Sequence, residues 1–151
     1  MTGATPGASL RARIFLVGVP RSGTTLLQAL LAAHSTVTSF TESHFFSRHF
    51  RPVSGLGTVL TTDPAPRVEE FIAENGAGAP AAAGWFGPPR PAVLRWGVLR
   101  PFGTRAVARR LVRVLDELAE ARGAAVWLEK TPRHLQRLDV IRQACDDDVT
   151  T

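Results

Sequence analysis

The sequence predicts an α/β fold in which helices flank a parallel β-sheet. Residues 14–19 form an apolar, β-branched run of the kind that a buried parallel strand carries. Residues 20–23 break this run with Pro and Gly, and residues 24–34 then have the composition and length of a buried helix. A strand, a glycine-containing loop and a helix in that order open a βαβ unit.

The size of the chain limits it to a single domain. Its 151 residues are 44% hydrophobic and 21% charged, which is enough for one compact core and too little for two domains of ordinary size. We expect a flexible tail over residues 1–13, an α/β domain over residues 14–145 and a disordered acidic end over residues 146–151.

The middle of the chain has a mixed pattern. Residues 36–40 are typical of a short strand, and residues 42–46 of a loop or a helical turn. A helix is predicted to begin at residues 63–64, an N-cap Asp followed by Pro, and to end before Gly76. Residues 76–91 consist mostly of Gly, Ala and Pro, which predicts a surface loop.

The last third of the chain predicts helix, strand and helix. Residues 104–122 place apolar side chains on one helical face, and residues 124–128 form a second apolar strand that runs into Glu129 and Lys130. Thr131 and the following Pro begin another helix. The apolar side chains expected to point inward from that helix are Leu135, Leu138 and Ile141.

Composition excludes several classes of protein. No apolar run approaches the roughly 18 residues of a membrane span, and a lone cysteine, Cys145, cannot form an internal disulfide. We therefore expect a cytoplasmic protein without a membrane span. The net charge of +5 favours an anionic partner, but no zinc-ligand spacing or RNA-binding motif accompanies it, so nucleic acid is not expected. The basic residues are 17 Arg and one Lys, Lys130.

Residues 18–25 fit the pattern G-x-x-x-x-G-x-[ST] of loops that bind phosphate, and we call this segment the phosphate loop. Glycines in such a loop let main-chain N–H groups surround an anion, and the following helix adds its N-terminal partial positive charge. Thr24 stands where nucleoside triphosphatases carry lysine, which argues against ordinary ATP or GTP hydrolysis, and Arg21 is a candidate replacement cation. The alternative is a tight turn that binds no ligand.

Residues 14–34, IFLVGVPRSGTTLLQALLAAH, resemble the 5′-phosphosulfate loop of sulfotransferases that use 3′-phosphoadenosine 5′-phosphosulfate (PAPS). The form of the loop is closest to the bacterial and Golgi-type branch that includes tyrosylprotein sulfotransferases. Glu42 lies at the distance from the loop where that branch has its general base. Residues 127–135, WLEKTPRHL, are similar to the segment in which the branch places a basic residue at the end of a strand.

The resemblance implies a P-loop-NTPase-like sheet and sulfuryl transfer from PAPS to a hydroxyl or amine, without a metal. It implies that Glu42 deprotonates the acceptor and that Arg21 and Lys130 stabilise the bridging oxygen and the leaving phosphate. Lys130 and the phosphate loop are also expected at one edge of the sheet, because ligands of open parallel sheets bind at the carboxyl ends of strands. The residues implied to hold the 5′-phosphosulfate are Arg21, Ser22, Gly23, Thr24 and Thr25.

The family's binding residues for the 3′-phosphate, an Arg and a Ser after the Lys130 segment, have no counterpart in this sequence. We therefore expect a sheet that is incomplete at its C-terminal end and a truncated, weakly active or inactive enzyme. A non-catalytic remnant with a phosphate-binding loop, and a P-loop kinase or nucleotide hydrolase, are the alternatives.

Each candidate residue also has a structural alternative. Glu42 is otherwise a solvated loop carboxylate, Lys130 pairs with Glu129, and His134 is a surface or packing residue. The acceptor pocket is expected within residues 43–103, whose composition fits a carbohydrate, lipid, peptide or small-molecule acceptor equally. The oligomeric state stays open.

Overall fold

The structure of the protein is a computed structural model that describes residues 9–76, residue 84 and residues 103–146. The described residues include most of the predicted domain. Most of the predicted Gly/Ala/Pro loop, most of the predicted N-terminal tail and nearly all of the acidic end lie outside the described residues, and so do Trp85 and Trp96.

The predicted α/β class is confirmed by a sheet of three parallel strands. The strands are β1 (Ala12–Leu16), β2 (Val37–Phe40) and β5 (Val126–Lys130), in the order β1-β5-β2. Leu16 pairs with Lys130, and Phe40 pairs with Glu129. Because the strands are parallel and end in register, their carboxyl ends form one edge of the sheet, where the phosphate loop begins.

The predictions for the first and last strands are confirmed in part. The first strand was predicted over residues 14–19 as a buried strand, but β1 ends at Leu16 and is only partly buried. The reason is its place at the edge of the sheet, where it pairs with β5 alone. The last strand, predicted over residues 124–128 and ending in Glu129 and Lys130, is confirmed to end at Lys130 but begins at Val126. Glu129 and Lys130 are neighbouring strand residues, so their side chains lie on opposite faces of the sheet.

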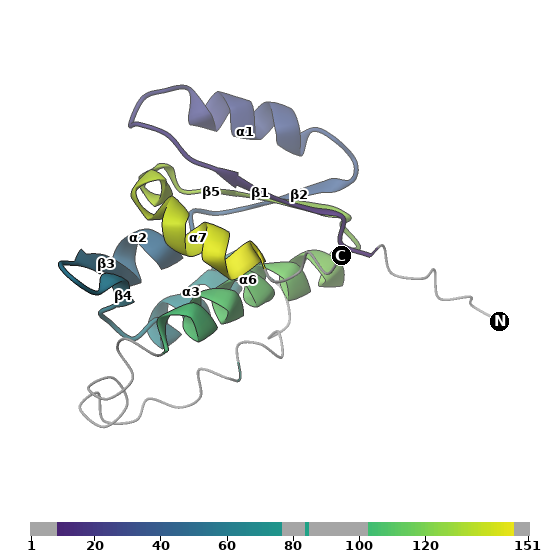
Figure 1. The fold of residues 1–151 in the computed structure, drawn as a ribbon. Helices are drawn as coiled ribbons and strands as arrows, with labels where there is room; N and C mark the ends of the chain where they lie inside the picture. Colours follow the sequence, from purple (N-terminus) through teal and green to yellow (C-terminus); the bar gives the residue numbers. More distant parts are fainter. Residues whose placement is uncertain (1–8, 77–83, 85–102, 147–151) are drawn as a thin grey trace.

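Helices cover the two faces of the sheet unequally (Figure 1). Helix α1 (Thr24–Ala32) lies on one face, and α3 (Ala65–Asn75), α6 (Thr104–Ala121) and α7 (Leu138–Cys145) lie on the other. The predicted inward face of the long helix is confirmed, and α3 ends at Gly76 in the left-handed conformation, as predicted. The buried apolar side chains of α6 are Val107, Ala108, Leu111, Val112, Val114, Leu115, Leu118 and Ala119.

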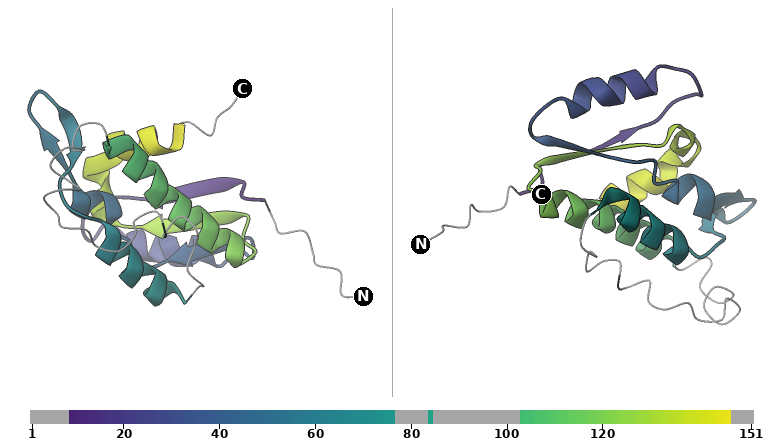
Figure 2. Two further views of the ribbon diagram at one scale, coloured as in Figure 1. Left: turned by 90° about the horizontal axis from the view of Figure 1, so that it is seen from below. Right: turned by 180° about the vertical axis from the view of Figure 1, so that it is seen from behind.

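The prediction that residues 24–34 form a buried helix is wrong in its burial. No residue of α1 is buried, and Leu26, Leu27 and Leu30 are 67%, 45% and 64% exposed. Within the described part of the chain α1 is the only helix on its face of a three-stranded sheet, so only one side of it packs (Figure 2). The apolar side chains of α1 are therefore largely exposed in this structure, although its composition predicts burial.

A short helix and a hairpin follow β2. Helix α2 (Phe45–His49) leads directly into the antiparallel pair β3 (Phe50–Val53) and β4 (Gly57–Leu60), which the sequence did not predict. Phe45, Phe46 and Phe50 are completely buried. This unit lies beyond the carboxyl edge of the sheet, next to the segment that follows β5 (Figure 1).

The helix predicted from residue 131 begins instead as the 3₁₀ helix η1 (Pro132–Arg137) and continues as α7. Ile141 points inward as predicted, but Leu135 and Leu138 are about half exposed. A 3₁₀ helix repeats every three residues, so His134 and Arg137 take the inward positions. Both are tolerated there because each finds a hydrogen-bond partner.

Candidate functional site

The phosphate loop connects β1 to α1 in a conformation that requires glycine. A Cβ atom on Gly18 would lie 2.8 Å from the hydroxyl of Ser22. Gly23 has φ 77°, in the left-handed region, and the non-glycine Arg21 has φ 66°. Left-handed residues in such a turn direct successive main-chain N–H groups toward one side, as in loops that bind anions.

The N-terminus of α1 is open to a ligand. No side chain caps it, so its first-turn N–H groups lack the hydrogen bond that a cap supplies. Arg21, Ser22 and Thr25 are exposed at the carboxyl edge of the sheet, and the side chain of Arg21 forms no hydrogen bond or ion pair with the described residues. The loop thus offers unused donors and a cation at one place.

Lys130 joins the phosphate loop to Glu42. Its Nζ lies 2.7 Å from the Oε1 atom of Glu42 and 3.4 Å from the hydroxyl of Thr25. The Lys130 side chain is 11% exposed and that of Glu42 is 37% exposed. The structure therefore brings together one residue from each of the three segments that the sequence singled out. The predicted alternative, a pair between Lys130 and Glu129, is wrong, since Glu129 points to the other face of the sheet and bonds elsewhere.

We call residues 41–46 the base segment, after the role expected for Glu42. These residues are held by a buried carboxylate that the sequence analysis did not identify. Glu129 is 0% exposed, and its Oε1 atom accepts hydrogen bonds from the N–H of Ser43 at 2.9 Å, from the hydroxyl of Ser43 at 2.8 Å and from the hydroxyl of Thr131. Burial opposes ionisation, but hydrogen bonds from His134, Thr131 and Ser43 hold the pKa of Glu129 below its ordinary value. A charged residue within an apolar strand was the available signal.

His134 is the third residue that bonds to Glu129 and is also completely buried, so the prediction of a packing residue agrees with its position. The main-chain N–H of Phe46 donates to Nε2 of His134, so Nδ1 carries the proton and donates to Oε2 of Glu129 at 3.2 Å. The ring thereby joins the start of α2 to the end of β5.

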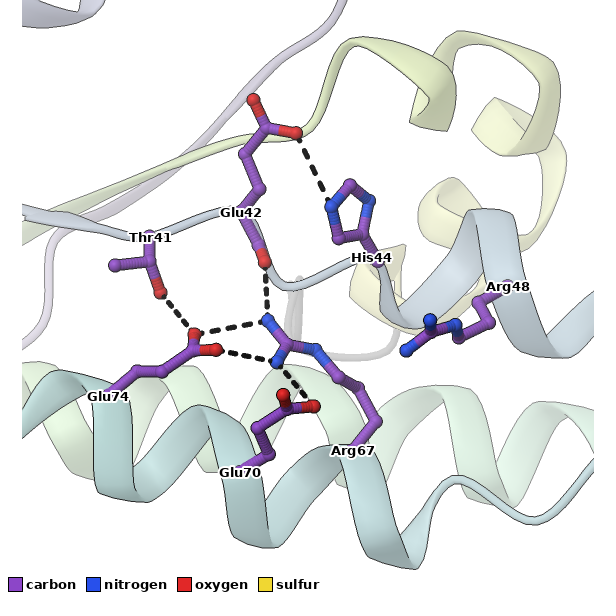
Figure 3. Close-up of a pocket in the computed structure, with 7 residues that line it drawn as sticks. All are labelled: Thr41, Glu42, His44, Arg48, Arg67, Glu70 and Glu74. Atoms are coloured by element: carbon purple, nitrogen blue, oxygen red, sulfur yellow. Dashed lines mark hydrogen bonds and ion pairs between the residues drawn. The ribbon is translucent and has the colours of Figure 1, made fainter.

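A cavity of about 420 Å³ opens beside the base segment (Figure 3). At its centre Arg67 is held by Glu70 and Glu74, and its guanidinium donates to the main-chain oxygens of Glu42 and Ser43 at 2.7 and 2.9 Å. The side chain of Glu42 points away from Arg67. The lining residues, all polar or charged, are Thr41, Glu42, His44, Arg48, Arg67, Glu70 and Glu74.

His44 is a second residue near Glu42 that the sequence analysis left aside. Its Nε2 atom lies 3.5 Å from Oε2 of Glu42, and its main chain has φ 56°, which is unusual for a residue other than glycine. Burial lowers the pKa of His44 below its ordinary value, although Glu42 opposes the shift. The neutral imidazole is therefore the dominant form at pH 7.

The described part of the chain has neither a metal site nor a membrane-spanning helix. Its residues include no group of three or more His, Cys, Asp or Glu side chains placed to hold a metal ion. None of its helices is long and apolar enough to cross a membrane.

Comparison with known families identifies the family of the chain. The family model described as "Sulfotransferase family" matches residues 13–147, which is most of the chain. The chain belongs to the sulfotransferase family. A search of curated proteins and a search of solved structures each found no match. Membership of the sulfotransferase family supports sulfuryl transfer as the general chemistry, and the parallel sheet with its loop agrees with a P-loop-like fold.

Proposed function

We propose that this protein is a PAPS-dependent sulfotransferase that transfers a sulfuryl group to a hydroxyl or amine, with Glu42 as the general base. The observation that carries the proposal is the position of Lys130, whose Nζ contacts both Glu42 and the hydroxyl of Thr25. A cation at this point connects the place where an anionic donor binds to the carboxylate that would accept the acceptor's proton.

The residues of the loop fit the 5′-phosphosulfate end of PAPS. The close approach at Gly18, the left-handed Gly23 and the uncapped start of α1 together make a cradle of main-chain N–H groups. The hydroxyls of Ser22, Thr24 and Thr25 and the guanidinium of Arg21 add donors of the type that sulfate and phosphate oxygens accept. When bound there, PAPS supplies the sulfuryl group that is transferred.

Glu42 is suited to accept a proton. Its side chain is partly exposed, so an acceptor hydroxyl can reach the carboxylate. Lys130 contacts this carboxylate in the structure described here, and the same ammonium is within reach of the loop. An anion in the loop competes with Glu42 for Lys130, which leaves the carboxylate freer to bind the acceptor's proton.

Fixed cations provide the rest of the catalysis in this proposal. Sulfuryl transfer leaves negative charge on several oxygens, and preorganised donors stabilise such charge most effectively. Lys130 is largely shielded from solvent, which strengthens its electrostatic effect. Arg21 lies within the loop itself and is exposed.

The experiment that tests the proposal is binding followed by turnover. We expect adenosine 3′,5′-bisphosphate to raise the unfolding temperature of the protein more than ADP does, and we expect Arg21→Ala to remove most of that shift. Radiolabelled PAPS with a panel of carbohydrate, peptide, lipid and phenolic acceptors then measures transfer. Binding without transfer to any acceptor favours a non-catalytic remnant, and hydrolysis of ATP with Mg²⁺ favours the kinase or hydrolase alternative.

A further inference from the structure

The main chain around Glu42 is bound from two sides by side chains that are distant in sequence. On one side, Glu129 accepts from the N–H of Ser43, Thr131 accepts from the N–H of His44 at 3.3 Å, and His134 accepts from the N–H of Phe46. Three N–H groups of a four-residue stretch are thus taken by three side chains of the segment 129–134.

The opposite side of the same stretch is held by α3. The guanidinium of Arg67 donates from Nε to the oxygen of Ser43 and from Nη2 to the oxygen of Glu42. Arg67 is itself fixed, since Nη1 lies 2.8 Å from Glu74 and 2.9 Å from Glu70. The hydrogen bond that Arg67 donates to Glu74 is the main cause that raises the pKa of Arg67 above its ordinary value, so its charge is permanent.

These contacts hold a buried charge in place. Glu129, Ser43, Thr131 and His134 are each completely buried, and a buried carboxylate without donors would be very costly. His44 is also held at a positive φ, a strained conformation that persists only where its surroundings impose it. The strain lies two residues from Glu42, at the point where the chain turns from β2 into α2.

We propose that Glu129, acting with His134, and Arg67 are positioning residues that fix the main chain of residues 42–46 so that the carboxylate of Glu42 meets Lys130. This inference rests on the proposed function, because it assigns a purpose to the position of Glu42. None of the three positioning residues lies in the phosphate loop, so they act on the base without acting on donor binding.

Lys130 is the only lysine of the chain, which makes the position of Glu42 measurable without turnover. An N-hydroxysuccinimidyl ester acylates neutral amines, and peptide mass spectrometry separates acylation of Lys130 from that of the N-terminal amine. Glu42 occupies the Nζ atom of Lys130 in the structure, so Glu42→Gln gives the acylation rate of the lysine without that contact. We expect Glu129→Gln to raise the acylation rate by about threefold, because a displaced Glu42 no longer occupies that atom.

Asp116→Asn is the matched control. Asp116 is a buried carboxylate that accepts from Arg13 and Trp127 and has no contact with the base segment. It should lower stability to a similar extent as Glu129→Gln and leave the acylation rate of Lys130 unchanged. Equal acylation rates in Glu129→Gln and the unsubstituted protein would overturn the proposal, and so would an equal increase in Asp116→Asn.

Arg67→Lys gives an independent test if Glu129→Gln does not fold. Lysine keeps the charge beside Glu70 and Glu74 but cannot donate to two carbonyl oxygens in a fixed geometry. The proposal predicts faster acylation of Lys130 in this variant as well, and an unchanged rate would contradict it.

Turnover adds a readout that a purely structural role would not change selectively. In Glu129→Gln we expect kcat to fall about tenfold, as for a misplaced catalytic group, while the Kd for adenosine 3′,5′-bisphosphate stays the same. A parallel loss of both would indicate general unfolding and overturn the proposal. If the unsubstituted protein transfers no sulfuryl group, the proposed function fails, whereas the acylation rates still report whether Glu129 and Arg67 hold Glu42.

Discussion

The phosphate loop and the base segment meet at one edge of the sheet but are held in opposite ways. The loop is exposed at Arg21, Ser22 and Gly23, and its main chain makes few hydrogen bonds, among them Gly18 N–H to Pro132 O at 3.3 Å. The base segment has its N–H and C=O groups bound by buried side chains. The main chain of the base segment is therefore bonded by the protein itself, whereas the loop leaves most of its N–H groups without a partner in the described residues, as the proposed donor site requires.

This contrast makes opposite predictions for the two regions. Substitutions in the loop should weaken anion binding with little change in stability, because the protein does not use those groups. Substitutions in the base segment should lower stability or kcat with little change in anion binding. The following substitutions test whether anion binding depends on the loop and stability on the base segment.

Glu42→Gln should have the largest effect on turnover. Loss of a general base lowers kcat by about 10²- to 10⁴-fold, and the partly exposed side chain should contribute little to stability. Steady-state kinetics with radiolabelled PAPS measures kcat, and calorimetry measures the Kd for adenosine 3′,5′-bisphosphate. Glu69→Gln, an exposed carboxylate on α3, is the control and should behave like the unsubstituted protein. Unchanged kcat in Glu42→Gln would remove its role as the base.

His49, in α2, should make the stability of the protein sensitive to acid. Burial, reinforced by Arg48, lowers the pKa of His49 from 6.5 to about 4. Between these values the unfolded chain binds one proton more than the native protein, so the free energy of unfolding should fall as the pH falls, by roughly 3 kcal/mol in all. Urea denaturation from pH 7 to pH 4 measures this slope.

His49→Asn should flatten that slope, since asparagine does not titrate and retains a partner for the hydroxyl of Thr62. His34→Asn replaces an exposed histidine and should leave the slope as it is. A slope that persists in His49→Asn would show that another group causes it.

Ser43 and Ser22 form a matched pair across the two regions. Ser43→Ala removes a buried hydrogen bond to Glu129 and should lower the free energy of unfolding by about 1–2 kcal/mol without changing the Kd for adenosine 3′,5′-bisphosphate. Ser22→Ala lies in the exposed loop and should weaken binding while the unfolding temperature stays constant. Thermal unfolding and calorimetry measure both quantities, and the reverse result would contradict the separation.

Gly23 and Gly55 test the loop at equal backbone strain. Both have φ 77°, and no atom lies within 4 Å of a Cβ built on either, so alanine at each should lower stability by about 1 kcal/mol. Only Gly23→Ala should weaken binding of adenosine 3′,5′-bisphosphate, because Gly55 belongs to the β3–β4 turn. Equal affinities in the two variants would indicate that the loop does not bind the donor.

The sequence predicted the class of fold and the glycine loop because both depend on local patterns, whereas Glu42 was a candidate only through the resemblance to sulfotransferases. The strand and glycine loop around Gly18, and the inward face of residues 104–122, follow from apolar runs, periodicity and turn residues. The burial of α1 could not be predicted, since it depends on which helices share its face of the sheet. Likewise, the inward turn of His134 depends on a 3₁₀ helix whose period differs from that of the predicted α-helix.

The contacts between the segments could not be predicted either. The sequence placed Glu42 and Lys130 as separate candidates, but the distance of 2.7 Å between them depends on how residues 41–46 cross the end of β5. Glu129 stands out in the sequence as a charge at the end of an apolar strand, but only the fold shows that Ser43, Thr131 and His134 surround it. Long-range hydrogen bonds of this kind leave no periodic pattern.

Hydrogen–deuterium exchange with and without adenosine 3′,5′-bisphosphate reports the phosphate loop and the base segment in one measurement. The amides of residues 43–46 should exchange slowly in the free protein, and the amides of residues 19–26 should exchange rapidly and become protected when the bisphosphate is added but not when ADP is added. Rapid exchange in residues 43–46, or a loop whose exchange ignores the bisphosphate, would contradict the account of a fixed base beside an open donor site.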